Sequence, residues 1–179
     1  MTQLTGIDVA VLERGYAATA DVLAAIPAGR WDAPSPCAGW TVRDVAEHLV
    51  DSLDFFAGTV SGAQDSGRTD LLAGFRDATG RCLAAFARPE VLAAEHPFPG
   101  GVLPGWVIAH ISLSESLVHG WDLATGAGLP YAPDAGVVAA VAALSDGPAP
   151  DGAFADPVPV PVGASPFEAL LGKLGREVR

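Results

Sequence analysis

Glu115 and His119 stand four residues apart in ISLSESLVHGWDLATG, residues 111–126, a stretch with the pattern of a helix. Side chains at this spacing share one face of a helix. On a helical wheel the pair falls in the stripe that Ile108 and Val118 mark as the core side. A buried carboxylate is costly unless it is paired, protonated or bound to a metal ion. This face is therefore the first candidate for chemistry.

A third candidate, His48, borders the apolar stripe of an earlier predicted helix, between Val45 and Leu49. If the two helices are neighbours, His48, Glu115 and His119 converge near the core. Two imidazoles and one carboxylate, with a fourth position open, form a catalytic-type site for zinc or a related divalent ion. The residues alone leave an alternative open, in which both histidines are satisfied core residues and Glu115 pairs with an arginine.

Three further residues could support such a site. Asp122, nearly one turn beyond His119, shares its face and either orients that imidazole or is simply an acid near the helix end. Asp44 stands four residues before His48 and could orient its ring, but a role in capping the helix is favoured. Trp40 is expected to be a packing residue that could also form a wall of a pocket beside the site.

The other sulfur and imidazole groups are expected to lie outside the site. Cys37 and Cys82 are far apart and form no CxxC, so neither a disulfide framework nor a thiolate zinc site is predicted. Each is expected to be a small buried residue, although Cys37 precedes a helix start, where the pKa of a thiol can fall. His96 lies in a predicted loop and is expected to be solvated, and His110 faces away from Glu115 and His119.

Four long segments with helical periodicity must position these side chains. They cover residues 8–26, a helix that opens at Thr41 and stops at SGAQDSG (61–67), residues 69–87 and residues 104–125. Thr41 followed by Asp44 is close to a capping box, and Pro104 before one helix with Gly after it is typical helix punctuation. The pattern predicts an all-α protein, an antiparallel four-helix bundle over about 8–126.

The chain is expected to form a single domain over residues 1–179, with a C-terminal extension over about 133–179. The extension holds a short predicted helix in DAGVVAAVAALSD, a Pro-rich segment at 147–166 and closing helical turns in FEALLGKLGR. Because the Pro-rich segment is too apolar for a free linker, we expect it to pack across the bundle.

The net charge of −11, from 21 acidic and 10 basic residues, disfavours nucleic acid and anionic lipid as partners. The sequence has no apolar run long enough for a membrane span and no basic leader, so a cytoplasmic protein is expected. GxGxxG, P-loop and GxSxG motifs are absent, which removes support for nucleotide binding and serine-hydrolase chemistry.

Two stretches together resemble a known family. SPCAGWTVRDVAEHLVDSL and HISLSESLVHGWDLATG are similar to the DinB-like N-terminal domain of mycothiol-dependent maleylpyruvate isomerases, and still more to the short actinobacterial metal-binding relatives of that enzyme. In that family a His on the second helix and a Glu-x-x-x-His pair on the fourth hold the metal. The resemblance places these ligands on His48, Glu115 and His119.

The resemblance implies a divalent metal ion, with zinc favoured over nickel, cobalt or iron, and mycothiol as a cosubstrate. The expected partners are a small-molecule thiol and an electrophile, and a homodimer is left open. The implied activity is that of a thiol-dependent transferase or isomerase-like enzyme that uses a metal-activated thiolate. A non-catalytic metal- or ligand-binding protein and a metal-dependent hydrolase remain as alternatives. The isomerase itself carries a sizeable second domain for which this chain has no room.

Overall fold

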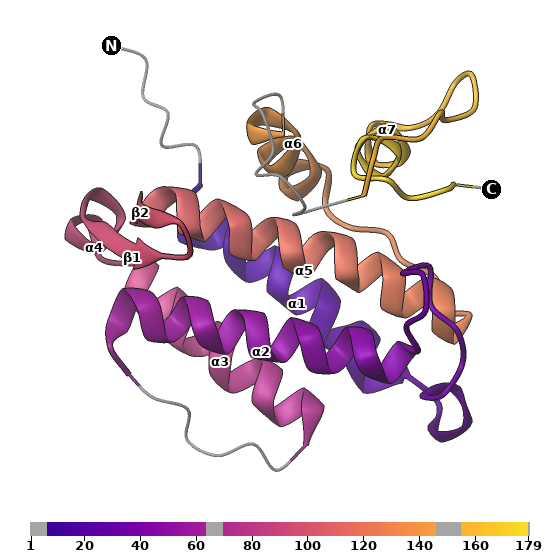
Figure 1. Cartoon of the computed structure of the whole chain (residues 1–179), viewed down its shortest axis with the longest axis horizontal. Coiled ribbons are helices and arrows are strands. Elements are labelled where there is room, and N and C mark those ends of the chain that lie inside the picture. Colours follow the sequence, from indigo (N-terminus) through magenta and orange to yellow (C-terminus); the bar gives the residue numbers. More distant parts are fainter. Residues whose placement is uncertain (1–6, 64–69, 146–154, 179) are drawn as a thin grey trace.

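The computed structural model describes residues 7–63, 70–145 and 155–178. Its framework is a bundle of four long helices: α1 (Val9–Ala25), α2 (Val42–Ser61), α3 (Leu71–Phe86) and α5 (Gly105–Ala127). In Figure 1, α1 and α5 run from one end of the bundle to the other, and α2 and α3 run back, so that α2 and α5 are antiparallel neighbours. The predicted all-α, DinB-like bundle is confirmed.

Local sequence signals explain where these helices begin and end. The Asp8 carboxylate accepts a hydrogen bond from the Val11 N–H at 2.8 Å, and Asp70 caps α3 in the same way. Thr41 and Asp44 form the capping box of α2, in which the Thr41 N–H donates to Asp44 at 2.8 Å. Gly62, with φ of 68°, ends α2 in the left-handed conformation that favours glycine.

The core lies between the four helices, and α5 is buried on most of its circumference. α1 and α2 cover one side of α5, while α4 (Pro89–Ala93) and α6 (Ala135–Leu144) cover other parts of it. The largest fully buried side chains include Leu12, Leu49, Leu53, Phe75, Phe86, Ile108, Leu113 and Leu117. His110 is consequently buried, although it lies on the side of α5 opposite the predicted ligand face.

The connection between α3 and α5 contains a hairpin that periodicity did not indicate. Strands β1 (Glu95–Phe98) and β2 (Gly101–Pro104) pair antiparallel around a turn at Gly100, whose φ is 89°. Each strand contains a proline, and a proline usually argues against a strand. It is tolerated here because both strands of a two-stranded hairpin are edge strands. The expectation of a solvated His96 is wrong. It lies in β1, half-buried, with Nε2 at 2.8 Å from the Val91 carbonyl.

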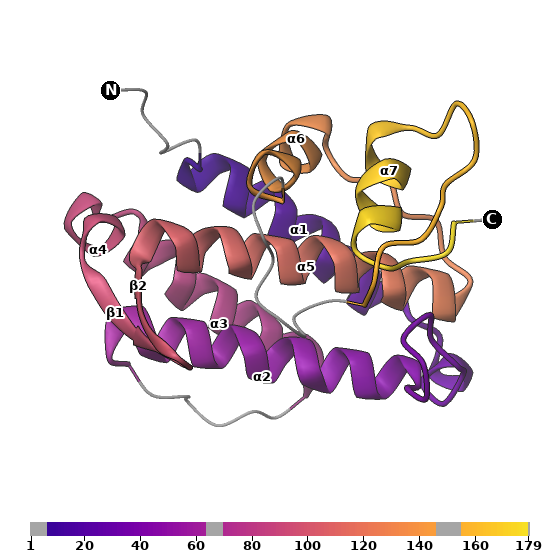
Figure 2. The ribbon, with the colours of Figure 1, turned by 45° about the horizontal axis from the view of Figure 1, so that its top comes forward.

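The C-terminal extension lies on the α5 side of the bundle, away from α2 and α3 (Figure 2). It contains α6 and α7 (Pro166–Lys173), which contact each other. The described part of the Pro-rich segment, 155–165, runs beside α7, where the Val158 N–H donates to the Gly172 carbonyl at 2.9 Å. The remainder of that segment, 147–154, lies outside the described residues, and its packing across the bundle stays a prediction.

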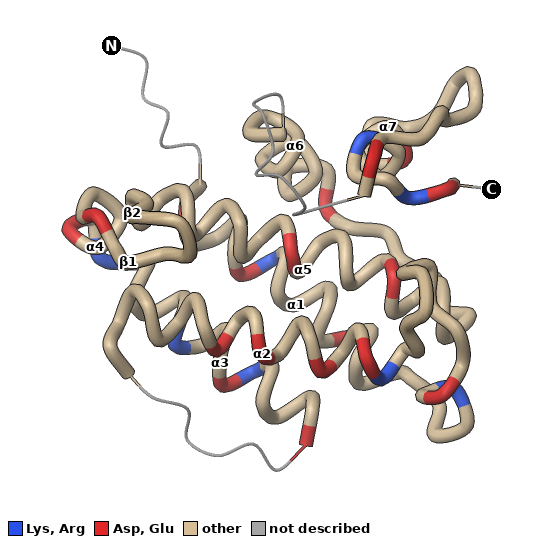
Figure 3. The backbone as a smooth tube through the Cα atoms, viewed as in Figure 1, with Lys and Arg blue, Asp and Glu red and all other residues tan. Residues whose placement is uncertain are grey.

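Acidic positions outnumber basic ones along the described backbone (Figure 3). Acidic residues occur on each of the four bundle helices, and α1, α2 and α3 also carry arginines. Among the described residues, we find no helix with the length and apolarity needed to cross a bilayer.

Candidate metal centre

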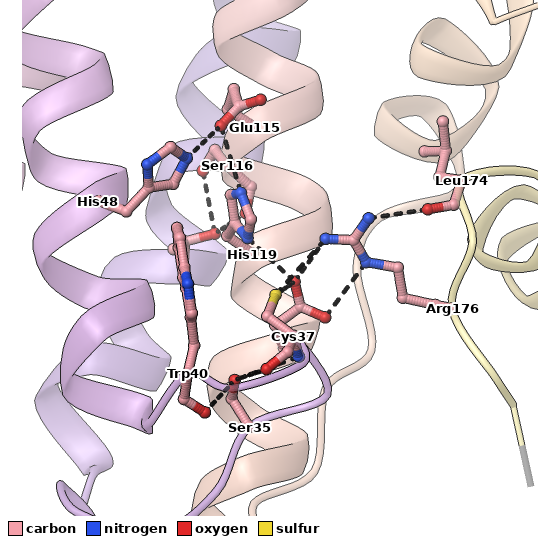
Figure 4. A network of polar contacts seen from close by, with 11 residues as sticks. Ser35, Cys37, Trp40, His48, Glu115, Ser116, His119, Leu174 and Arg176 are labelled. Carbon is pink, nitrogen blue, oxygen red and sulfur yellow. Dashed lines mark hydrogen bonds and ion pairs between the residues drawn. The ribbon is translucent and has the colours of Figure 1, made fainter. Parts of the chain in front are cut away.

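The structure brings His48 of α2 together with Glu115 and His119 of α5 (Figure 4). The Glu115 Oε2 atom lies 3.4 Å from His48 Nε2 and 3.3 Å from His119 Nε2. The i, i+4 spacing puts Glu115 and His119 on one face of α5, and the packing of α2 against α5 adds His48. Ligand atoms of all three lie within 4.8 Å of one another.

The Glu115 Oε2 atom is buried without a hydrogen-bond partner among the described residues. Its separations from the two imidazole nitrogens are longer than ordinary N–H···O hydrogen bonds, which run from about 2.7 to 3.2 Å. A buried carboxylate oxygen that two imidazole nitrogens approach without a well-formed hydrogen bond matches a donor set arranged around a cation. Two imidazoles and one carboxylate are ligands that zinc and related divalent ions accept. The residues therefore fit a metal ion.

The three side chains are buried to different degrees, and the group is accessible on the side of His48. The side chains of His119 and Glu115 are 7% and 14% exposed, whereas that of His48 is 40% exposed. Trp40 stands beside His48 with the two ring centroids 5.0 Å apart in an edge-to-face arrangement, and it is itself partly exposed. His48 is therefore the most exposed member of the group, with the Trp40 indole against its ring.

Burial and the neighbouring polar groups shift the pKa values of Glu115 and His119 in opposite directions. Burial raises the pKa of Glu115, but the interactions with His119 and His48 outweigh burial and bring it down to about 2. Burial lowers the pKa of His119, but its contacts with Asp122 and Glu115 outweigh burial and raise it well above its ordinary value. Glu115 is therefore an anion throughout the physiological range, stabilised by its two histidine neighbours.

Asp122 is completely buried and contacts the far side of the His119 ring. The His119 Nδ1–H donates to Asp122 Oδ2 at 2.9 Å, since a carboxylate only accepts. This bond directs Nε2 of the same ring toward Glu115 and His48. Carboxylates commonly orient metal-binding histidines in this way. Asp122 was expected either to orient the His119 imidazole or to be simply an acid near the helix end, and its contact with the imidazole agrees with the first role.

A second group of potential ligands, Cys37, His119 and Asp122, also lies within 4.8 Å. The Cys37 thiol donates to Asp122 Oδ2 at 3.3 Å. Arg176, however, places its Nη2 at 2.9 Å from the same oxygen. Because a guanidinium is permanently charged, it already neutralises Asp122 and opposes a cation at this position. The group formed by His48, Glu115 and His119 is the stronger candidate.

The remaining sequence candidates occupy structural positions. Asp44 serves the capping box of α2, the favoured one of its two roles. Cys82 is buried, with the pKa of its thiol raised to about 12 mainly by burial, whereas Cys37 is half-buried. His110 has a buried Nδ1 without a hydrogen-bond partner among the described residues, and burial lowers its pKa to about 4.

Sequence reasoning missed Arg176, which holds Asp122 from a position 54 residues further along the chain. The available signal was Gly175, a typical glycine just after a helix end, which predicts a chain reversal before Arg176.

A cleft of about 1060 Å³ opens between α5, the loop at 34–36 and the C-terminal extension. Trp121, Tyr131 and Phe167 are among its lining residues, and none of the three candidate ligands is. The cleft is thus a feature separate from the exposed edge of the metal group.

A family model described as the mycothiol maleylpyruvate isomerase N-terminal domain matches residues 12–124. Two uncharacterized proteins of Mycobacterium tuberculosis, Rv0738 of strain H37Rv and MT0763 of strain CDC 1551 / Oshkosh, are each 34% identical to the chain over 176 residues. Each match covers 93% of this chain and 96% of the relative. No solved structure matches the chain. The range of the family match contains His48, Glu115 and His119 and ends before the extension.

Proposed function

The chain belongs to the family of the mycothiol maleylpyruvate isomerase N-terminal domain, and on this premise we propose that it is a divalent-metal enzyme that adds or transfers a low-molecular-weight thiol. The observation that carries the proposal is the buried Glu115 Oε2, approached by His48 and His119 at 3.4 and 3.3 Å without a hydrogen bond. Zinc is the favoured ion, with nickel, cobalt or iron as alternatives that the same donor set accepts.

The three candidate ligands and their neighbours have different tasks. His48, Glu115 and His119 hold the ion and leave coordination positions open, as in catalytic rather than structural zinc sites. When bound, the ion lowers the pKa of a thiol, so that a thiolate forms near neutral pH. The Glu115 carboxylate offsets part of the positive charge. Asp122 fixes the ring of His119, and Trp40 walls the side on which His48 is exposed.

The reaction that we propose is the addition of the thiol to an electrophilic carbon. A sulfur–carbon bond forms, the electron pair of the attacked double bond moves onto the electrophile, and the proton of the thiol ends on the electrophile. No oxidant or reductant is consumed. The family's name makes mycothiol the first thiol to test, and a conjugated carbonyl compound is the simplest electrophile for this chemistry.

A cobalt-substituted protein tests the thiol part of the proposal directly. We expect mycothiol, or N-acetylcysteine as a simpler thiol, to produce a saturable thiolate-to-cobalt absorption band. The band is expected to be lost in His48→Ala, while His96→Gln, which changes a histidine outside the group, retains it. Saturable metal binding without any thiol band would contradict the proposal. Thiol-independent ester hydrolysis by the same protein would favour the metal-dependent hydrolase instead.

A further inference from the structure

Arg176 (Figure 4) is largely buried and clamps the carboxylate of Asp122. Its Nη2 donates to Asp122 Oδ2 at 2.9 Å, and its Nε lies 3.4 Å from Oδ1. Its Nη1 donates to the Leu174 carbonyl at 2.8 Å, which fixes the guanidinium from the other side. The arginine side chain is 10% exposed and the aspartate 0%. Both oxygens of the carboxylate are thereby held by one planar group.

The turn after α7 aims Arg176 at this carboxylate. Gly175 follows the helix with φ of 81°, a left-handed conformation that favours glycine. The Arg176 N–H donates to the Leu171 carbonyl at 2.9 Å and the Gly175 N–H to the Gly172 carbonyl at 3.1 Å. These two bonds are the Schellman pattern that ends many helices. The backbone that carries Arg176 is therefore fixed by α7.

The helix that carries this turn is itself packed tightly. Leu170 and Leu171 are buried, and Gly172 approaches the 155–160 segment so closely that a Cβ would lie 2.2 Å from a methyl carbon of Val160. The Val158 N–H to Gly172 carbonyl bond adds a backbone connection. Arg176 thus reaches Asp122 from a well-anchored element that lies outside the range of the family match, 12–124.

We propose that Arg176 is a positioning residue for the metal centre, which it serves through Asp122 and His119. The guanidinium holds the Asp122 carboxylate where it accepts the His119 Nδ1–H at 2.9 Å, and this bond turns Nε2 toward Glu115 and His48. The C-terminal extension completes a centre whose ligands all come from the bundle. The effect on metal affinity rests on the proposed function, whereas the effect on the His119 ring does not.

The other contacts of Asp122 cannot replace the arginine. The Cys37 thiol, at 3.3 Å, is a weak donor. Without the guanidinium, a fully buried carboxylate is left with a single strong donor, the imidazole that it must orient. A buried charge with too few partners is unstable and rearranges. A lysine supplies the charge but not the planar fork that contacts both oxygens.

The sign of the effect separates positioning from charge. The positive charge of Arg176 repels a divalent cation, so its removal strengthens metal binding if charge alone matters. Loss of positioning weakens metal binding instead. Mutation of residues that orient metal ligands typically reduces metal affinity about 10- to 100-fold.

The test compares Arg176→Ala and Arg176→Lys with the parent and with Arg30→Ala. Arg30 is a matched control, since it hydrogen-bonds the carbonyls of Gly126 and Ala127 on the same helix as Asp122 but does not contact the carboxylate. Zinc affinity is measured by competition with a chromophoric chelator. The His119 Nδ1–H proton is followed by NMR in the metal-free protein, with its resonance assigned by its loss in His119→Ala.

We expect zinc to bind Arg176→Ala about 10-fold or more weakly, and the Nδ1–H proton to move upfield and exchange faster with solvent. Arg176→Lys is expected to be intermediate, and Arg30→Ala to match the parent in both readouts. Unchanged or tighter zinc binding with an unchanged proton resonance overturns the proposal. If Arg176→Ala does not fold, the lysine variant decides in the same way. If the parent binds no zinc, the proposed function fails, while the proton resonance still tests whether Arg176 positions His119.

Discussion

The Nε2 atom of His48 on α2 lies 3.4 Å from the Oε2 atom of Glu115 on α5. This contact joins two antiparallel helices at the level of the candidate metal group. The packing of these helices therefore sets the distance between two candidate ligands, which local sequence cannot fix. Any substitution that shifts α5 within the bundle is expected to disturb the group.

The close approach of α1 to α5 makes Gly120, the neighbour of His119, sensitive to substitution. A Cβ at Gly120 would lie 2.6 Å from Thr19 Oγ1 and 2.7 Å from the Tyr131 hydroxyl. We expect Gly120→Ala to destabilise the protein by about 1–3 kcal/mol in urea unfolding, because the neighbours must move. Gly80→Ala is the matched control. It lies in α3 with open space around it, so alanine is expected to stabilise by about 0.5–1 kcal/mol. Equal stability of the two variants would contradict the close approach.

His110 is expected to make the stability depend on pH. Burial lowers its pKa from 6.5 to about 4 in the folded protein. As the pH falls below 6.5, the unfolded chain binds a proton at His110 that the folded protein does not. The contribution of His110 to the free energy of unfolding is therefore fully present above pH 6.5 and is lost as the pH falls toward 4. The loss is at most roughly 2 kcal/mol at pH 5. In chelator-treated protein, His110→Gln is expected to lose less stability than the parent between pH 7 and 5. Identical losses in urea midpoints would show that His110 does not carry this dependence.

Metal removal is expected to leave the fold intact. The core contains many fully buried apolar side chains from all four bundle helices, so the ion is not needed to bring them together. After chelation we expect an unchanged helical circular dichroism spectrum and a lower Tm, which zinc restores in a concentration-dependent manner. Cooperative unfolding on chelation would indicate a structural metal and support the non-catalytic alternative.

The helices and the candidate ligand face could be predicted from sequence because their signals are local. Capping residues such as Thr41 mark helix starts, and the spacing of Glu115 and His119 places both on one face whatever surrounds the helix. The environment of the opposite face was not predictable. His110 is buried because further elements cover α5, and a helical wheel of α5 alone does not show those elements.

Other features depend on contacts between residues distant in sequence. The strand that holds His96 contains a proline, which is typical of loops, and only its pairing with β2 makes it a strand. Arg176 meets Asp122 because the extension folds back over α5, and helical periodicity does not encode that return. The three candidate ligands were therefore accessible to sequence reasoning, whereas the sequence signals only the turn before Arg176 and not its contact with Asp122.

The metal content of untagged protein, measured by elemental analysis, tests the central claim most directly. We expect roughly one divalent ion per chain in the parent and in His96→Gln. His48→Ala, Glu115→Gln and His119→Ala are each expected to lose the ion while keeping their helical spectra. A parent protein that holds no ion even after incubation with zinc would contradict the account, as would three variants that all retain it.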